Sequence, residues 1–221
     1  MWIDYHTHIL PAMDDGARDV AQADAMLHLL RKQEVAEVVL TPHYYADRET
    51  VEEFLKRRAA AYFSLITCDE GKRMPLRLGA EVRLERNMCR MDALPQLCIE
   101  GTRFLLLELP YAPFEPWMMR EIENIAYRLR VTPILAHLDR YLTMGWLTRE
   151  EWEELIGFGD AVVQINAEAF EERALRRPLK ELLDSDVPVV FGTDAHDMQD
   201  RAPNGHLLKK ALRHYVPPVL W

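Results

Sequence analysis

The 221-residue chain is poor in cysteine, with three thiols and no Cys-x-x-Cys pair. So sparse and odd a set argues against a disulfide framework and suits a reducing compartment. The Cys-x5-Arg loop of thiol phosphatases is also missing. The residues six positions after Cys68, Cys89 and Cys98 are Met74, Pro95 and Phe104. The sequence therefore offers no cysteine nucleophile of that type.

Long apolar runs and excess positive charge are absent as well. No stretch of about 18 uninterrupted apolar residues occurs, so the sequence predicts no membrane-spanning helix. Residues 1–6 lack the basic start and apolar run of a signal peptide, and we expect a cytoplasmic protein. Lys and Arg number 27 against 36 Asp and Glu, which gives a net charge of −9. This balance disfavours non-specific binding to nucleic acids or anionic membranes.

Apolar residues make up 49% of the chain, and no repeat, low-complexity tract or Ser/Gly-rich linker divides it. We therefore expect one domain over residues 1–221 with a sizeable core. Short runs rich in Val, Ile and Leu are typical of buried parallel strands. These runs span residues 2–5, 36–41, 76–80, 104–109, 133–136, 161–165 and 188–193.

Helical patterns lie between these runs. They cover residues 20–33, 49–66, 148–157, 175–184 and 204–214, with a further apolar stripe at Met118, Ile122, Ile125 and Leu129. Asp19 and Gln22 predict a capping box at the start of the first helix. Strands that alternate with helices predict an α/β fold with a parallel sheet. Periodicity leaves an open sheet and a closed, irregular barrel as alternatives.

Polar residues that can bind metal ions follow the ends of the apolar runs. In chain order they are His6 and His8, His43, Glu81, Glu108, His137, Asn166, and Asp194 with His196. The C-terminal ends of parallel strands converge, so we expect these side chains on one rim. Residues i and i+2 of an extended segment point the same way, which allows His6 and His8 to reach one ion. Asp14-Asp15-Gly16 supplies a further carboxylate in the loop after the first strand.

A set of imidazoles and carboxylates without cysteine suits divalent ions such as Zn²⁺, Fe²⁺ and Mn²⁺. Five histidines and four carboxylates are many for two ions. Asp15, Glu81, Glu108 and Asp194 together carry four negative charges, which two divalent ions neutralise and three exceed. A centre that accepts a phosphate dianion is better left positive, which favours three ions. Arg140 and Arg201 follow His137 and His196 closely, and a guanidinium holds phosphate oxygens bidentately.

A single histidine beside a strand is more often structural than a ligand. The metal-site hypothesis therefore depends on the placement of all these residues at one edge. The remaining histidines, His28, His206 and His214, fall in helical patterns and are expected to face solvent.

Sequence motifs also connect these residues to a known family. The motifs are DYHTHILP at 4–11, DDGA at 14–17, TPH at 41–43, GAE at 79–81, LELP at 107–110, AHLDRY at 136–141, QIN at 164–166 and TDAH at 193–196. In order and spacing they resemble the polymerase-and-histidinol-phosphatase (PHP) superfamily. More narrowly, they resemble the bacterial PHP-type protein-tyrosine phosphatases of capsule and exopolysaccharide loci.

The resemblance implies a distorted (β/α)7 barrel in a single domain, holding three divalent ions. Manganese is the expected metal, with Fe²⁺ or Zn²⁺ as alternatives. The implied metal ligands are His6, His8, Asp15, His43, Glu81, Glu108, His137, Asp194 and His196. Glu81 is the implied bridging carboxylate, and Arg140 and Arg201 take the family's phosphate-contacting positions. The family usually has His-Pro-Glu-Arg where this chain has His137-Leu138-Asp139-Arg140.

The leading hypothesis is a metal-dependent protein-tyrosine phosphatase that hydrolyses phosphomonoesters by a metal-bridged hydroxide. The resemblance implies a phosphotyrosyl protein as substrate, namely a bacterial tyrosine kinase of polysaccharide export. The alternatives are another PHP phosphoesterase, acting on histidinol phosphate or on nucleotide phosphodiesters, and a non-catalytic module with structural ions. Structural sites are usually closed sets of four ligands, so nine candidate ligands and two arginines disfavour the module. The sequence leaves the oligomeric state open.

Overall fold

Two parallel sheets form the centre of the computed structural model, which describes residues 1–159 and 161–221. The first sheet has the order β1-β2-β4, with β1 at Trp2–Thr7, β2 at Val35–Leu40 and β4 at Leu76–Leu78. The second has the order β3-β5-β6-β7-β8-β9. Its strands span His43–Tyr44, Glu81–Arg83, Phe104–Glu108, Thr132–Leu135, Val162–Asn166 and Val189–Gly192, respectively. The predicted α/β fold with parallel strands is confirmed.

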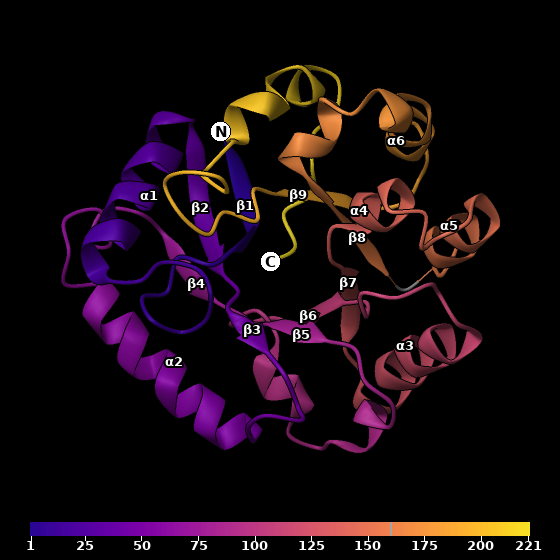
Figure 1. The fold of residues 1–221 in the computed structure, drawn as a ribbon, viewed down its shortest axis with the longest axis horizontal. Helices are drawn as coiled ribbons and strands as arrows, with labels where there is room; N and C mark the ends of the chain where they lie inside the picture. The colour runs from indigo at the N-terminus through magenta and orange to yellow at the C-terminus, as the bar shows by residue number, and fades with distance from the viewer. Residues whose placement is uncertain (160) are drawn as a thin grey trace.

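Helices cover the outside of the strands (Figure 1). The α-helices are α1 Val20–Lys32, α2 Val51–Leu65, α3 Pro116–Leu129, α4 Leu138–Thr143, α5 Arg149–Ile156 and α6 Arg176–Leu183. Short 3-10 helices occur at Met88–Arg90, Leu94–Leu97, Ala167–Phe170, Arg173–Leu175, Gly205–Lys209 and Ala211–Arg213. Among the described residues, none of the helices combines the length and the apolar character of a membrane span.

Local sequence explains where several helices begin. Thr50 and Thr148 each form a complete capping box with a glutamate three residues later, at the starts of α2 and α5. The predicted box at α1 is only half formed. Asp19 accepts from the backbone N–H of Gln22 at 2.8 Å, but the Gln22 side chain accepts from the N–H of Arg18. The reciprocal half of that prediction is wrong because Arg18 offers Gln22 two donors.

The predicted helix over 204–214 is wrong in type. The chain forms two 3-10 helices there, with hydrogen bonds from the N–H of Leu207 to the carbonyl of Asn204 and from His214 to Ala211. Gly205 packs directly on the ring of Trp2, where even a Cβ atom would lie 2.5 Å from a ring carbon. An apolar stripe of this length is compatible with either helix type, and the contact with Trp2 came from a distant part of the chain.

Two short strands that the sequence did not predict, β3 and β5, follow the predicted runs 36–41 and 76–80 and connect the two sheets. β2 ends at Leu40 and β3 begins at His43, while β4 ends at Leu78 and β5 begins at Glu81. Hydrogen bonds continue across both breaks, from Gly79 N–H to the Leu40 carbonyl and from Glu81 N–H to the Pro42 carbonyl. His43 and Glu81 are paired at the starts of β3 and β5, and the Glu81 carboxylate lies beside His6 near the end of β1.

One face of both sheets encloses a small apolar core. It contains one residue from each of six strands: Tyr5, Val39, Leu106, Ile134, Val162 and Val190. Alternate residues of a strand point to opposite faces, so this set comes from one side of each strand. A larger core lies between the strands and the surrounding helices.

The C-terminal residues cover one end of the small core, and the chain end lies near the centre of the view in Figure 1. The Tyr5 hydroxyl donates to the carbonyl of Pro218 at 3.1 Å and accepts from the N–H of Leu220 at 3.2 Å. The Trp221 ring lies 5.3 Å from the Tyr5 ring and beneath the guanidinium of Arg77. The Tyr5 side chain is buried. Its hydroxyl therefore provides a hydrogen-bond partner for the Pro218 carbonyl and the Leu220 N–H where water is largely excluded.

We predict that Tyr5→Phe lowers the free energy of unfolding by about 1 kcal/mol, because it removes the shared partner of two backbone groups. Urea denaturation followed by circular dichroism measures the change. Tyr127→Phe serves as the matched control, because Tyr127 is 86% exposed. Equal unfolding free energies for Tyr5→Phe and the unsubstituted protein would contradict this role of the hydroxyl.

Candidate metal centre

The end of β1 places two imidazoles next to each other. The Nε2 atoms of His6 and His8 lie 3.1 Å apart, as expected for residues i and i+2 of an extended segment. The Nδ1 atom of each ring makes a hydrogen bond on the side away from the other imidazole. His6 Nδ1 lies 2.9 Å from Gln164 Oε1, and His8 Nδ1 lies 2.7 Å from Asp14 Oδ2. Oxygen acceptors at Nδ1 select the tautomer that leaves Nε2 with its lone pair toward the centre of the site.

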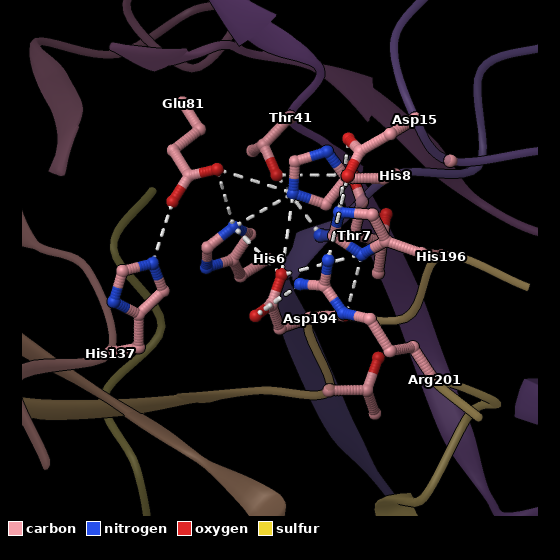
Figure 2. Close-up of polar contacts among 12 residues, drawn as sticks. His6, Thr7, His8, Asp15, Thr41, Glu81, His137, Asp194, His196 and Arg201 are labelled. Atoms are coloured by element: carbon pink, nitrogen blue, oxygen red, sulfur yellow. Dashed lines mark hydrogen bonds and ion pairs between the residues drawn. The ribbon is translucent and has the colours of Figure 1, made fainter. Parts of the chain in front are cut away.

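Glu81 contacts several imidazoles, and Figure 2 shows its contacts with His6, His8 and His137. Its Oε2 is 3.2 Å from His6 Nε2, 3.3 Å from His8 Nε2 and 2.9 Å from His43 Nδ1. Its Oε1 is 2.9 Å from His137 Nε2. Burial opposes ionisation of Glu81, but the imidazoles of His6 and His43 outweigh it and hold the pKa of this carboxyl well below its ordinary value.

Asp194 forms a second anionic point beside Glu81. Its Oδ1 lies 3.5 Å from His6 Nε2, 3.4 Å from His8 Nε2 and 3.6 Å from His196 Nδ1. Burial opposes its ionisation too, but His6 and the hydrogen bond of His8 hold the pKa of Asp194 well below its ordinary value. Two buried, ionised carboxylates therefore face the same group of imidazoles.

The remaining predicted ligands close the cluster on two sides. Asp15 Oδ1 lies 3.5 Å from His43 Nε2 and 3.4 Å from His196 Nε2. Glu108 Oε1 lies 3.5 Å from His137 Nε2 on the opposite side. All nine residues named from the sequence as ligands thus lie in one connected cluster. Their role as ligands remains a prediction.

The donor set fits divalent cations. Buried side-chain nitrogen or oxygen atoms without a hydrogen-bond partner occur in His43, Glu81, Glu108, His137 and His196; within the described ranges, the others are in Gln33 and Asn204. His43 Nδ1 and Glu81 Oε2 lie close yet make no hydrogen bond. Burying polar atoms without partners is costly, and a cation would satisfy them. Three overlapping groups have ligand atoms within 4.8 Å of one another: His8-Asp15-His43-His196, His6-His8-Glu81 and His43-Glu81-Glu108.

Both predicted anion-binding arginines lie at the edge of this cluster. Arg140 and Arg201 donate to the same oxygen of Asp194, Arg201 at 2.9 Å. Arg201 also lies 3.7 Å from Asp15 Oδ2. Arg140 donates from its other nitrogen to the Tyr111 hydroxyl at 3.0 Å, which fixes the direction of the guanidinium. The two positive groups therefore converge beside the candidate metal ligands.

Backbone geometry at the cluster is strained at two non-glycine residues. His137 has φ 30° and Asp194 has φ 51°, both in the left-handed region. Gly16 provides a close approach: its amide neighbour Ala17 donates to the His8 carbonyl, and a Cβ at Gly16 would lie 2.0 Å from that oxygen. Only glycine lets the loop with Asp14 and Asp15 fold back onto the end of β1.

The departure of this chain from the family's His-Pro-Glu-Arg pattern leaves Arg140 at the site. Asp139 is buried and turned away from the cluster, and it accepts a hydrogen bond from the N–H of Asn166 at 3.0 Å. Burial raises the pKa of Asp139 to about 6. Leu138 is buried in the core. These two side chains fix the short helix α4 that carries Arg140.

Sequence reasoning missed the residues that orient the imidazoles. The sequence places Asp14 only in an acidic loop, but in the structure it accepts from His8, from the N–H of His43 at 2.9 Å and from the N–H of Gly16. The sequence shows Gln164 only as part of the QIN motif, but in the structure its Oε1 accepts from His6 and from the N–H of His137 at 2.8 Å. Two features of the sequence could have indicated these roles. Asp14 is one of two adjacent acidic residues in the DDG segment, and Gln164 is a polar residue within an apolar strand.

The other histidines lie outside the cluster, as the sequence predicts. His206 and His214 are exposed. His28 is partly exposed and lies 3.1 Å from Glu70 Oε1, in a surface ion-pair group with Arg31.

The geometry defines an α/β protein with a histidine- and carboxylate-rich cluster suited to divalent metal ions. The chain belongs to the CpsB/CapC family, described as capsular polysaccharide synthesis, whose sequence pattern matches residues 2–216. A tyrosine-protein phosphatase of Bacillus subtilis, YwqE, is 29% identical over 145 residues, which cover 62% of this chain and 54% of YwqE. The matched part thus spans about half of YwqE. CapC of Staphylococcus aureus is 26% identical, over 90% of this chain and 78% of CapC.

Solved structures share the fold. This chain matches a chain from the crystal structures of YwqE from Bacillus subtilis and CpsB from Streptococcus pneumoniae, which are described as metal-dependent tyrosine phosphatases. The TM-score is 0.73 at 21% identity, over 99% of this chain and 89% of the other. The likeness supports the architecture described above.

We predict that Asp14→Asn weakens Mn²⁺ binding to the metal-free protein by about 10–100-fold, because it removes the charged acceptor that orients His8. Burial opposes ionisation of Asp14, but His8 outweighs it and lowers the pKa of this carboxyl. Isothermal titration calorimetry with Mn²⁺ measures the affinity. Asp69→Asn, the same change at an exposed position, is the control and should bind Mn²⁺ as the unsubstituted protein does. Equal affinities for both variants would contradict an orienting role.

Proposed function

We propose that this chain is a metal-dependent protein-tyrosine phosphatase. The single observation that carries the proposal is the convergence of five imidazoles, four carboxylates and two arginines at one end of the parallel strands. Phosphomonoester hydrolysis needs cations to activate water and positive groups to hold the phosphoryl oxygens. The naming of YwqE as a tyrosine-protein phosphatase, and membership of a capsular polysaccharide family, support phosphotyrosyl protein as the substrate.

The nine clustered residues would hold the metal ions, with Glu81 as the central bridging carboxylate. We infer three divalent ions, with Mn²⁺ favoured over Fe²⁺ and Zn²⁺, because three ions leave the centre positive toward a phosphate dianion. When bound, such ions act as Lewis acids and lower the pKa of water toward neutrality, which supplies a nucleophile for the phosphorus. His6 and His8 are oriented for this role by Gln164 and Asp14.

Arg140 and Arg201 would bind the phosphoryl oxygens. Both guanidinium groups meet at one oxygen of Asp194, so they already point to a common anionic atom. Each has further donors in a planar fork that fits phosphate oxygens. Charge on those oxygens grows in the transition state, and fixed donors stabilise it at no cost of reorganisation. Tyr111 positions Arg140 through its hydroxyl.

We further propose that residues 1–221 form one domain with a distorted (β/α)7 barrel. The two sheets share a core whose members come from both, and helices cover the outside. The end of β1 also reaches the segment that follows β9. The N–H of His8 donates to the Ala195 carbonyl at 2.9 Å, and the N–H of Asp194 donates to the His6 carbonyl at 2.8 Å. These bonds support closure between the first and last strands.

We propose a bacterial tyrosine kinase of polysaccharide export as the phosphotyrosyl partner. The capsular polysaccharide description of the family supports this partner. A kinase that autophosphorylates on tyrosine would require a phosphatase to restore its unphosphorylated form.

We predict that EDTA abolishes hydrolysis of p-nitrophenyl phosphate and that Mn²⁺ restores it. Iodoacetamide should have little effect, because burial raises the pKa of Cys68 and of Cys89, and raises that of Cys98 to about 11. Thiolate, the reactive form, is therefore scarce at neutral pH. Full activity in a metal-free sample would refute metal dependence. Faster turnover of histidinol phosphate or a dinucleotide than of a phosphotyrosyl peptide would favour another phosphoesterase activity.

We also predict that Arg140→Ala and Arg201→Ala each lower kcat/KM for p-nitrophenyl phosphate by about 10²-fold, since each removes donors to the charged oxygens. Metal content, measured by plasma emission, should stay as in the unsubstituted protein. Arg120→Ala, on the exposed surface of α3, is the matched control. Unchanged kcat/KM in both site variants would exclude the arginines from phosphate binding.

A further inference from the structure

A large cleft opens directly beside the candidate metal centre. Its volume is about 1060 Å³, and its wall shares Asp15 and His43 with the metal cluster. Lys56, Arg57 and Ala60 on helix α2 line the side farther from the cluster. Pockets of about 300–1,000 Å³ hold drug-sized ligands, so this cleft has far more room than one phosphorylated phenol ring needs. The extra space extends from Asp15 and His43 to helix α2.

The carboxylates in the cleft wall already have partners. Glu49 pairs with Arg57 at 2.5 Å, Glu53 accepts from Thr50 in the capping box of α2, Asp14 holds His8, and Asp15 lies between His43 and His196. Arg57 is also occupied, because it donates to the carbonyl of Met13 at 2.6 Å. Thr50 leaves the charge of Glu53 in place, whereas the other carboxylates of the wall face an arginine or an imidazole.

Two cationic side chains of the cleft wall, Arg48 and Lys56, have no ion-pair partner among the described residues. Arg48 and Lys56 are exposed, and neither has a carboxylate oxygen within 4.0 Å anywhere in residues 1–159 and 161–221. Arg48 is nevertheless fixed in place, since its guanidinium carbon lies 4.2 Å from the centre of the Tyr45 ring. That ring is stacked in turn on His43, with ring centres 5.3 Å apart. The positive charge of Arg48 is thus connected to the candidate metal ligand His43 through the Tyr45 ring.

We propose that this cleft binds the polypeptide that flanks the phosphotyrosine, and that Arg48 and Lys56 select substrates with acidic residues in that flank. This inference rests on the proposed phosphatase function and names the class of its protein substrate. The partner is an extended segment whose Asp or Glu side chains lie within a few residues of the phosphotyrosine. The complementary charges on the cleft wall are the ones that no internal carboxylate neutralises.

The net charge of −9 does not oppose this preference at short range. Interactions between exposed charges are screened over about 8 Å at physiological ionic strength. The charges nearest to the bound segment therefore dominate. In the cleft the two cations Arg48 and Lys56 outnumber Glu53, the one carboxylate of the wall without a cationic or imidazole partner. The preference should weaken as salt concentration rises.

The test uses three fluorescent peptides that carry a non-hydrolysable phosphonate analogue of phosphotyrosine, with Glu, Gln or Lys at the flanking positions. Fluorescence anisotropy on the Mn²⁺-loaded full chain gives the Kd of each. We expect the Glu peptide to bind about three- to tenfold more tightly than the Lys peptide, the range expected for exposed ion pairs. In the double variant Arg48→Gln/Lys56→Gln, that ratio should fall to about one. Hydrolysis of the matching phosphotyrosyl peptides gives kcat/KM in parallel.

The control variant Lys209→Gln/Lys210→Gln removes the same charge outside the cleft and should keep the ratio. Equal Kd values for the three peptides on the unsubstituted protein would overturn the inference, as would an unchanged ratio in Arg48→Gln/Lys56→Gln. Hydrolysis of phosphotyrosyl peptides without such a preference would support the proposed phosphatase activity and overturn the proposed selection of acidic flanks. A binding preference without hydrolysis of any peptide would instead overturn the proposed phosphatase activity, while the cleft would still be a site for acidic peptides.

Discussion

Ionised Glu81 and Asp194 carboxylates lie buried among imidazoles, and an anion removed from water must be offset by nearby positive charge. Part of that charge comes from Arg140 and Arg201, which both bind Asp194. Several buried polar atoms of the cluster still lack hydrogen-bond partners, as in Glu108. Divalent cations satisfy this demand most directly. The same electrostatic requirement explains why the site suits a phosphate dianion once the cations are bound.

The scaffold meets this requirement through backbone geometry that ordinary loops avoid. Asp194 and His137 adopt left-handed conformations, which cost energy in non-glycine residues and persist only where surrounding contacts fix them. Asp4 supplies such contacts behind Asp194, since its carboxylate accepts from both the N–H and the hydroxyl of Thr193. Gly16 brings the acidic loop onto the end of β1. Precise placement of the metal-binding side chains therefore comes from strands and tight turns, whereas the cleft next to them is built on helix α2 and exposed side chains.

The two parts of the site would divide the work of recognition. The cluster and the arginines would act on the phosphoryl group, which every phosphotyrosyl substrate shares. The cleft would bind the polypeptide next to the phosphotyrosine, whose sequence differs between substrates. Because Tyr45 connects His43 to Arg48 by stacking, the two parts are in physical contact. A substrate would thus be held on both sides of its phosphotyrosine ring.

The sequence alone determined the alternation of the longer strands and helices and the residues that gather in one cluster, because short apolar runs predict parallel strands whose C-terminal ends converge. It correctly grouped His6 with Glu81 and Asp194 although they are far apart in the chain. Only the tertiary structure decided which nitrogen of each imidazole faces the centre. That choice depends on acceptors such as Gln164, which lies 158 residues from His6. It also decided the short strands β3 and β5, which begin at His43 and Glu81, and the 3-10 form of the C-terminal helices. Local patterns carry no information about such contacts, since they form only when distant segments pack together.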